Sequence, residues 1–236
     1  VAPPGPYPKL FALPRHPVAD AEYAIGFYAS TLVRDGGTLQ IGIGALADAL
    51  CHALVLRHTD NAAYRRVLRA LDPEIERHPA VIASGGLDPF AIGLYGCSEM
   101  INEGFRKLVQ TGVLRRKIVD DEALMRRIGD GSASDEDLAR VEREGEFLHG
   151  AFFLGSHEFY DWLRGLDDAG QRAIGMRRVS EVNELYGGRE MLEKAQRRDA
   201  RFFNTCMMAT ALGAAVSDGL ADGRVVSGVG GQYNFV

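Results

Sequence analysis

The chain has 236 residues, and its 27 lysines and arginines against 32 aspartates and glutamates give a formal charge of −5 at pH 7. A composition that is 46% hydrophobic and 25% charged is ordinary for a globular protein and excludes a disordered, collagen-like or strongly basic chain. The mild acidity lacks the electrostatic footprint of a general nucleic-acid binder. No apolar run approaches the ~18 residues of a membrane span, so we expect no membrane partner.

Two residue types stand out from this ordinary composition. Glycine makes up 28 of the 236 residues, about 12% against a usual ~7%. Such an excess predicts many tight turns or close backbone approaches. The three cysteines, Cys51, Cys97 and Cys206, lack CxxC spacing and predict neither a disulfide framework nor a zinc site. We therefore expect a reducing, cytoplasmic setting.

The first 17 residues hold six of the nine prolines. Because proline fixes φ and lacks an N–H group, it disfavours helices and interior strands. Residues 1–17 are therefore predicted to form a linker or extended arm, ahead of a domain over 18–236.

From residue 20 onward, helices and strands alternate. The pattern predicts helices over 20–33 and 45–57 on either side of a strand over 38–41 and a glycine turn. A second strand is predicted over 90–95, and a helix over 99–110 that Ser98 caps and Gly112 stops. A charged surface insertion follows over 115–146, with a helix start at Ser134. The remaining predicted elements are a strand over 147–154, a helix over 156–163 and strands over 202–208 and 224–227. This alternation predicts an α/β fold with a mainly parallel sheet covered on both faces.

The segment from Gly42 to Ala47 follows a predicted strand and opens a helix, so it matches the dinucleotide fingerprint G-x-G-x-x-A. A Rossmann unit needs a later strand that ends in an acid, and no strand precedes Asp60. A nucleotide-dependent oxidoreductase is therefore a weak alternative. Taken alone, the glycine turn favours close packing, while contact between a ligand and the backbone N–H groups is the other reading.

Glu99 is predicted to lie directly after a helix cap. A carboxylate in this position is stabilised by the helix dipole, which is the general explanation for such an acid. The functional alternative is a desolvated carboxylate at the end of a sheet, which can attack an activated acyl group.

The segment from Gly228 to Gly231 also follows a predicted strand. It either presents N–H groups to an oxyanion or forms a tight turn. The six histidines form no metal-binding pattern, and His149 and His157 are interpreted as structural.

Three segments, in order, resemble the acetyl-CoA hydrolase/transferase family, which includes 4-hydroxybutyrate and succinyl-CoA:acetate CoA-transferases. They are residues 35–44 (DGGTLQIGIG), 98–101 (SEMI) and 227–236 (SGVGGQYNFV). The resemblance spans about 18–236 and corresponds to the C-terminal half of the family, incomplete at its C-terminal end.

The resemblance implies an open three-layer α/β/α domain with a mainly parallel sheet and helical insertions. It also implies that Glu99 is the nucleophile and forms a glutamyl-CoA thioester, and that Asn183 orients the carboxylate or carbonyl. By the same transfer, substrate or CoA contacts fall on Gly42, Ile43, Gly44, Gly228, Gly230 and Gly231. The CoA thioester is then a substrate, with no permanently bound cofactor and no metal.

The implied partners are an acyl-CoA, a small carboxylate, the N-terminal half of the same enzyme and a second copy in a homodimer. Residues 204–216 (NTCMMATALGAAV) depart from the family pattern, because its polar positions are here Met208, Thr210 and Ala214. This departure keeps open a second hypothesis, a catalytically degenerate member with a structural or regulatory role.

Overall fold

The computed structural model describes residues 5, 10–14, 16–184 and 186–228, with the backbone alone at Asn183. A five-stranded parallel sheet forms its centre, in the order β6-β4-β2-β1-β7. The strands are β1 (Thr38–Ile41), β2 (Tyr95–Cys97), β4 (Leu148–Gly150), β6 (Ile174–Met176) and β7 (Ala200–Phe203). The predicted parallel sheet is confirmed, and β1 has the bounds expected from the sequence.

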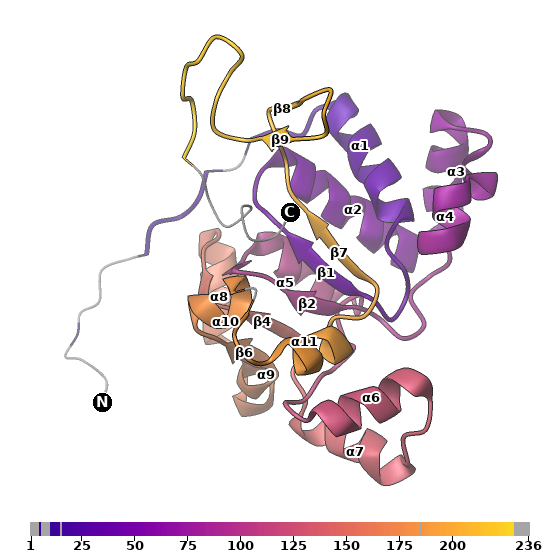
Figure 1. The fold of residues 1–236 in the computed structure, drawn as a ribbon, viewed down its shortest axis with the longest axis vertical. Coiled ribbons are helices and arrows are strands. Elements are labelled where there is room, and N and C mark those ends of the chain that lie inside the picture. The colour runs from indigo at the N-terminus through magenta and orange to yellow at the C-terminus, as the bar shows by residue number, and fades with distance from the viewer. Residues whose placement is uncertain (1–4, 6–9, 15, 185, 229–236) are drawn as a thin grey trace.

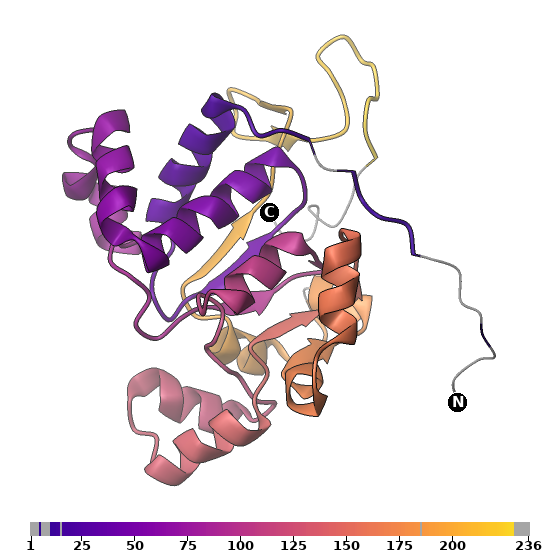
Figure 2. The same cartoon turned by 180° about the vertical axis from the view of Figure 1, so that it is seen from behind.

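Helices cover both faces of the sheet (Figures 1 and 2). One face carries α1 (Asp20–Thr31), α2 (Ala45–Thr59), α5 (Glu103–Gln110) and α8 (His157–Arg164), and the other carries α10 (Val179–Asn183) and α11 (Glu190–Gln196). Leu39 and Ile41 pack in the core beneath α2 and α5. Because strand side chains alternate, Thr38 and Gln40 point to the other face. The α/β/α layering implied by the sequence is therefore present.

The predicted helix over 45–57 continues to Thr59, and another helix follows it at once. This helix, α3 (Asn61–Leu71), packs with η1 (Ile75–Arg77) and α4 (Pro79–Ser84) on α1 and α2 through a separate apolar cluster. The Asp60 side chain caps α3 by accepting a hydrogen bond from Ala63 N at 2.9 Å. Asp60 is thus a helix cap and not the end of a strand, which removes the structural context that a dinucleotide fingerprint requires.

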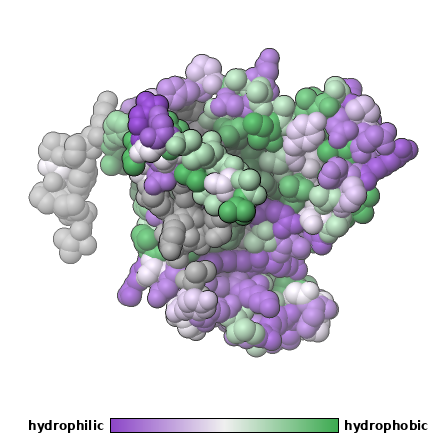
Figure 3. Space-filling model, turned by 45° about the horizontal axis from the view of Figure 1, so that its top comes forward, coloured by the Kyte–Doolittle hydropathy of each residue, from purple (hydrophilic) through white to green (hydrophobic). Residues whose placement is uncertain are grey.

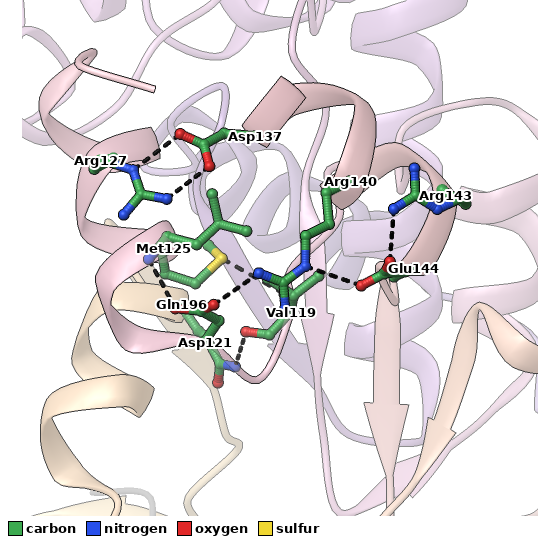
Figure 4. Close-up of polar contacts among 10 residues, drawn as sticks. Val119, Asp121, Met125, Arg127, Asp137, Arg140, Arg143, Glu144 and Gln196 are labelled. Atoms are coloured by element: carbon green, nitrogen blue, oxygen red, sulfur yellow. Dashed lines mark hydrogen bonds and ion pairs between the residues drawn. The ribbon is translucent and has the colours of Figure 1, made fainter. Parts of the chain in front are cut away.

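The charged insertion folds as a helical hairpin of α6 (Glu122–Asp130) and α7 (Asp135–Glu144), with the predicted cap at Ser134. Its apolar side chains Leu124, Met125 and Val141 pack against the strand-side cluster that contains Tyr95. Figure 4 shows its polar contacts, which include an Arg127–Asp137 pair and the hydrogen bond from Gln196 Nε2 to Val119 O at 2.8 Å. Among the described residues, no helix here or elsewhere is long and apolar enough to span a bilayer.

The strand predicted over 90–95 is wrong in its position, because β2 begins only at Tyr95. The backbone N–H groups of Ala91, Ile92 and Gly93 donate to the Asp35 carboxylate at 2.8 to 3.1 Å. These groups therefore wrap around a side chain and do not join the sheet.

The predicted strand over 147–154 is split into β4 and β5 (Phe152–Phe153), and β5 pairs with β3 (Met100–Ile101) in parallel. The strand predicted over 202–208 becomes β7 and then β8 (Met208–Ala209), which forms an antiparallel hairpin with β9 (Ala215–Val216). The Thr210 hydroxyl accepts a hydrogen bond from Ala214 N at 3.0 Å and closes this hairpin. The strand predicted over 224–227 contributes only an isolated bridge at Val225. The remaining helix, α9 (Asp168–Arg172), precedes β6.

Candidate functional site

A cavity of about 680 Å³, hereafter the strand-end cavity, lies at the carboxyl ends of β1, β2 and β7. Strand order reverses at β1, which has β2 on one side and β7, the last strand of the sheet, on the other. In open parallel sheets, ligands bind outside the carboxyl ends of the strands at such a reversal. Figure 3 turns this end of the molecule toward the viewer, where hydrophobic residues gather above a more hydrophilic lower edge.

One wall of the strand-end cavity is the glycine turn between β1 and α2, to which Gly42 and Ile43 contribute; Gly44, the third residue of the turn, lines only the second cavity described below. Gly44 has φ = 104° and ψ = 177°, a conformation that is essentially restricted to glycine. A Cβ atom added at Gly42 or Gly44 would meet no atom of the described residues within 4 Å. Within this part of the chain the two glycines are not closely packed, contrary to the close-packing interpretation of this turn.

The first turn of α2 adds backbone N–H groups to this wall. Gly44 is the N-cap of α2 and has no side chain that could cap the helix. The first N–H groups of a helix have no partner within the helix, and the helix dipole gives this end a partial positive charge. Asn102 holds the turn in place, since its Nδ2 donates to Gly42 O at 2.9 Å.

The opposite wall contains Glu99, together with Ser98 and Met100. The predicted helix start here is wrong: α5 begins at Glu103, and Asn102 is its N-cap, accepting from Gly104 N at 2.9 Å. Glu99 is half-buried in a bend between β2 and β3, and its carbonyl accepts from Ala151 N at 2.8 Å and Phe152 N at 3.2 Å. Since Glu99 is not in the first turn of a helix, the helix-dipole explanation for it is also wrong.

Of the other predicted contact residues, Gly228 also lines the strand-end cavity, and a Cβ there would meet none of the residues that the structure describes within 4 Å. Gly230 and Gly231 lie outside the described residues. Asn183 ends α10, which follows β6 at the sheet edge remote from β7, and its side chain is also outside the description. The structure therefore brings Glu99 together with Gly42, Ile43 and Gly228.

Sequence reasoning missed several polar residues of this cavity, among them Gln40 and Cys206. Gln40 is 4% exposed, and its Oε1 atom is buried with no hydrogen-bond partner among the described residues. Leaving a buried polar atom unpaired costs roughly 1–3 kcal/mol. Cys206 is exposed in the wall formed by the chain that follows β7. The signal that could have marked Gln40 is a long amide side chain within a short strand that is predicted to lie inside the sheet, Thr38–Ile41.

A second cavity of about 280 Å³ lies on the other side of the same glycine turn. Its walls include Leu13 and Pro14, and Leu13 N donates to Gly155 O at 3.1 Å. The buried Glu103 carboxylate also lines it, paired with Arg106 and with Ser156 Oγ at 2.8 Å. The turn thus has a cavity on each side.

A metal centre is not indicated by the side chains that the structure places. Within residues 10–14, 16–184 and 186–228, no group of three or more His, Cys, Asp or Glu side chains is arranged to hold a metal ion. The strand-end cavity instead offers one carboxylate, two amides, one thiol, several hydroxyl groups and backbone donors. Such groups suit covalent chemistry on a carbonyl more than metal-assisted chemistry.

Comparison with known sequences agrees with the motifs. Residues 155–236 match the family model for the acetyl-CoA hydrolase/transferase C-terminal domain. The chain is 23% identical over 219 residues to the 4-hydroxybutyrate coenzyme A transferase of Clostridium kluyveri, covering 93% of this chain and 35% of that protein. The chain thus spans about a third of the length of this curated relative. These matches confirm the resemblance to the C-terminal portion of the acetyl-CoA hydrolase/transferase family.

Comparison with solved structures gives the same fold. The crystal structure of RipA from Yersinia pestis is 20% identical with a TM-score of 0.56, covering 90% of this chain and 34% of that one. A variant of RipA is 21% identical with a TM-score of 0.59, covering 98% of this chain and 37% of the other.

Proposed function

We propose that this chain, a C-terminal portion of the acetyl-CoA hydrolase/transferase family, carries the nucleophile of an acyl-CoA:carboxylate CoA-transferase or acyl-CoA hydrolase, and that the nucleophile is Glu99. The observation that carries the proposal is the placement of Glu99, in a bend at the carboxyl ends of parallel strands, across one cavity from an open glycine turn. CoA-transferase or hydrolase chemistry in general is supported by the sequence matches.

The proposed reaction begins with attack of the Glu99 carboxylate on the thioester carbonyl. The carbon–sulfur bond breaks, CoA leaves as the thiolate, and an acyl-glutamyl anhydride remains. The thiolate then attacks the glutamyl carbonyl, which releases the acyl group as a carboxylate and leaves a glutamyl-CoA thioester. An acceptor carboxylate then attacks the carbonyl of the glutamyl-CoA thioester and releases CoA as the thiolate. The thiolate attacks the acceptor's carbonyl in the new anhydride, which forms the acceptor's CoA thioester and frees the Glu99 carboxylate. Alternatively, water hydrolyses the glutamyl-CoA thioester. Each step replaces one carbonyl substituent by another, with no oxidant and no bound cofactor.

The cavity supplies what a carboxylate nucleophile needs. A carboxylate is a weak nucleophile in water and gains from a desolvated site with fixed donors near the developing oxyanion. We assign the oxyanion contacts to backbone groups around Ile43 and the first turn of α2, which has no side-chain cap. Gly228 leaves room for the substrate, as does Gly42. The roles proposed for Gly230, Gly231 and Asn183 come from the family resemblance.

The activity belongs to a longer assembly in this proposal. Because the chain spans 35% of its curated relative, we expect the N-terminal half of the same protein to complete the CoA pocket. A homodimer and a cytoplasmic location are likewise proposed.

The test uses the full-length protein. Incubation with an acyl-CoA followed by borohydride reduction converts a glutamyl thioester to an alcohol, which peptide mass spectrometry then locates. We expect the modification on Glu99 alone. Glu99→Gln should lower turnover at least about 10³-fold, as removal of a nucleophile does elsewhere. Glu122→Gln, on α6, is the matched control and should leave turnover unchanged.

Two results would overturn the proposal. An active protein that turns over acyl-CoA without a Glu99 adduct needs another nucleophile. A folded full-length protein that shows neither adduct nor turnover supports the degenerate, structural role. Binding of NAD(P) in calorimetry would revive the oxidoreductase alternative, which the helix α3 in place of a second Rossmann strand argues against.

A further inference from the structure

Three polar side chains meet in the interior directly beneath the Glu99 bend. Tyr95 and Cys97 on β2 and His149 on β4 are 0%, 3% and 5% exposed. His149 Nδ1 is hydrogen-bonded to the Tyr95 hydroxyl, and His149 Nε2 lies 3.2 Å from Cys97 Sγ. Cys97 and His149 are direct neighbours in the parallel β2–β4 ladder. The imidazole therefore bridges two residues of the strand that leads to Glu99.

The protonation states of these groups suit a fixed bridge. Burial lowers the pKa of His149 to about 3, so its imidazole is neutral near pH 7. Burial also raises the pKa of the Cys97 thiol to about 11 and that of the Tyr95 hydroxyl well above its usual value. A neutral imidazole accepts a hydrogen bond at one nitrogen and donates one at the other, and so satisfies both neighbours at once.

Backbone contacts join the same two segments on the other side of His149. Ser98 N donates to His149 O at 3.1 Å, and the Glu99 carbonyl accepts from Ala151 N and Phe152 N. A Cβ on Gly150 would lie 2.6 Å from Ile101 Cγ1 and 3.1 Å from Ser98 O, so the two segments are in close contact. The bend that carries Glu99 is thus held between two parallel strand pairs, β2–β4 below and β3–β5 above.

We infer that His149 is a positioning residue for Glu99: by bridging Tyr95 and Cys97 it fixes β2 against β4 at the last residues before the bend, and so orients the nucleophilic carboxylate. This inference rests on the proposed function. His149 touches no reacting atom in this scheme, because it lies under the bend. Its effect passes through Cys97 and through the backbone of residues 98 and 99.

Loss of the bridge should therefore act on the rate of nucleophilic attack. His149→Phe keeps a ring of similar size but leaves the Tyr95 hydroxyl without its partner, and a buried unpaired group favours rearrangement of the strand pair. Displacement of a reacting group by about 1 Å can slow a reaction about 10²-fold. We expect the first-order rate constant for Glu99 adduct formation to fall about 10- to 100-fold, with acyl-CoA affinity changed less than about twofold.

The experiment follows adduct formation in the full-length protein by rapid quench into borohydride. It records the rate constant and the final amplitude separately, because misfolded protein lowers only the amplitude. Tyr95→Phe removes a single hydroxyl and should lower the rate constant about three- to tenfold; it carries the test if His149→Phe does not fold. His149→Gln keeps a donor and an acceptor and should recover part of the rate. His58→Phe, near the far end of α2, is the control and should react at the wild-type rate.

The possible failures are distinct. A wild-type protein that forms no Glu99 adduct overturns the proposed function and this inference together. A normal wild-type adduct with unchanged rate constants in His149→Phe and Tyr95→Phe overturns the positioning role alone. A reduced amplitude at an unchanged rate constant assigns His149 to stability only, and also overturns it.

Discussion

The α6–α7 hairpin and the strand-end cavity differ in how their polar groups are paired. In the hairpin both helices have side-chain caps, Asp121 and Ser134, and the arginines lie in ion pairs. These pairs are Arg126–Glu122, Arg127–Asp137, Arg140–Asp121, Arg140–Glu144 and Arg143–Glu144, several of them drawn in Figure 4. At the strand ends, by contrast, the N-cap of α2 is Gly44, which has no side chain to cap the helix, and Gln40 Oε1 is unpaired among the described residues.

This difference distinguishes polar groups that are paired within the fold from polar groups that remain available to a ligand. A folded protein pairs nearly all of its buried polar groups, so unpaired groups need a reason. The arginines of the hairpin all have partners, whereas the buried Gln40 Oε1 at the strand ends has none among the described residues, as happens where a ligand supplies the missing partner. If this distinction holds, the cavity binds substrate, whereas the hairpin only contributes stability.

The largest expected effect is on cysteine reactivity. Cys206 is exposed in the wall of the strand-end cavity, whereas Cys51 and Cys97 are buried. Buried thiols react only when the structure opens, so N-ethylmaleimide should label Cys206 at least about 10³-fold faster than the other two. Acyl-CoA should slow the labelling of Cys206 if it occupies the cavity. Peptide mass spectrometry measures all three rates in the full-length protein.

The hairpin supplies the control for that protection. Ser132 is exposed between α6 and α7, and Ser132→Cys places a thiol there. Its labelling should be insensitive to acyl-CoA. Equal protection at both positions, or none at Cys206, would break the distinction between the two regions.

The second prediction separates the two glycines of the turn. Gly44→Ala forces a side chain into the conformation at φ = 104° and should lower the free energy of unfolding by about 1–3 kcal/mol. The methyl group of Gly42→Ala meets no described atom within 4 Å and should change stability by less than about 0.5 kcal/mol. Its methyl group enters the cavity, however, and should lower kcat/KM for acyl-CoA about 10- to 100-fold. Chemical denaturation measures the loss of stability in both variants, and steady-state kinetics measures their kcat/KM. A fully active Gly42→Ala protein would show that the substrate does not bind beside Gly42.

The third prediction concerns pH. Between about pH 6.5 and pH 3 the unfolded chain protonates His149, but the folded chain does not, because burial lowers the pKa of His149 to about 3. The unfolded state then binds more protons, so the free energy of unfolding falls as the pH falls, by up to about 1.4 kcal/mol per pH unit. His149→Phe should remove this slope. Asp137 in the hairpin, whose pKa is lowered chiefly by Arg127, adds a slope of the same sign only below about pH 5, where the carboxyl of the unfolded chain takes up its proton, and wild type and His149→Phe share that slope. Denaturation at several pH values between 4 and 7 measures the difference, and equal slopes in wild type and His149→Phe would contradict the burial argument.

The same contrast explains what the sequence could predict. The hairpin start at Ser134 and the strand over 38–41 follow from local signals, a cap with acids in the first turn and an apolar run before glycines. The start of α5 was misplaced because Ser98 resembles a helix cap in the sequence. The actual cap is Asn102, whose side chain also donates a hydrogen bond to Gly42 O in the glycine turn. This contact joins segments far apart in the sequence, so only the folded chain shows it. The bridge at His149 depends on the β2–β4 register, which no local pattern encodes. Long-range pairing was therefore the missing information.

The smallest expected effect lies in the hairpin. The Ser134 hydroxyl accepts from Asp137 N at 3.2 Å in a capping box, so Ser134→Ala should destabilise the protein by about 1 kcal/mol. Ser134→Gly is the matched variant and should lower the free energy of unfolding by only a few tenths of a kcal/mol, since glycine is itself tolerated at an N-cap. Because the hairpin packs on the sheet through Leu124 and Val141 and contributes no residue to the cavity wall, both variants should keep the wild-type kcat and KM. Thermal denaturation and steady-state kinetics measure the two quantities on the same samples. A loss of turnover in Ser134→Ala beyond its loss of folded protein would show that the hairpin acts on the site, and the division between the two regions would have to be abandoned.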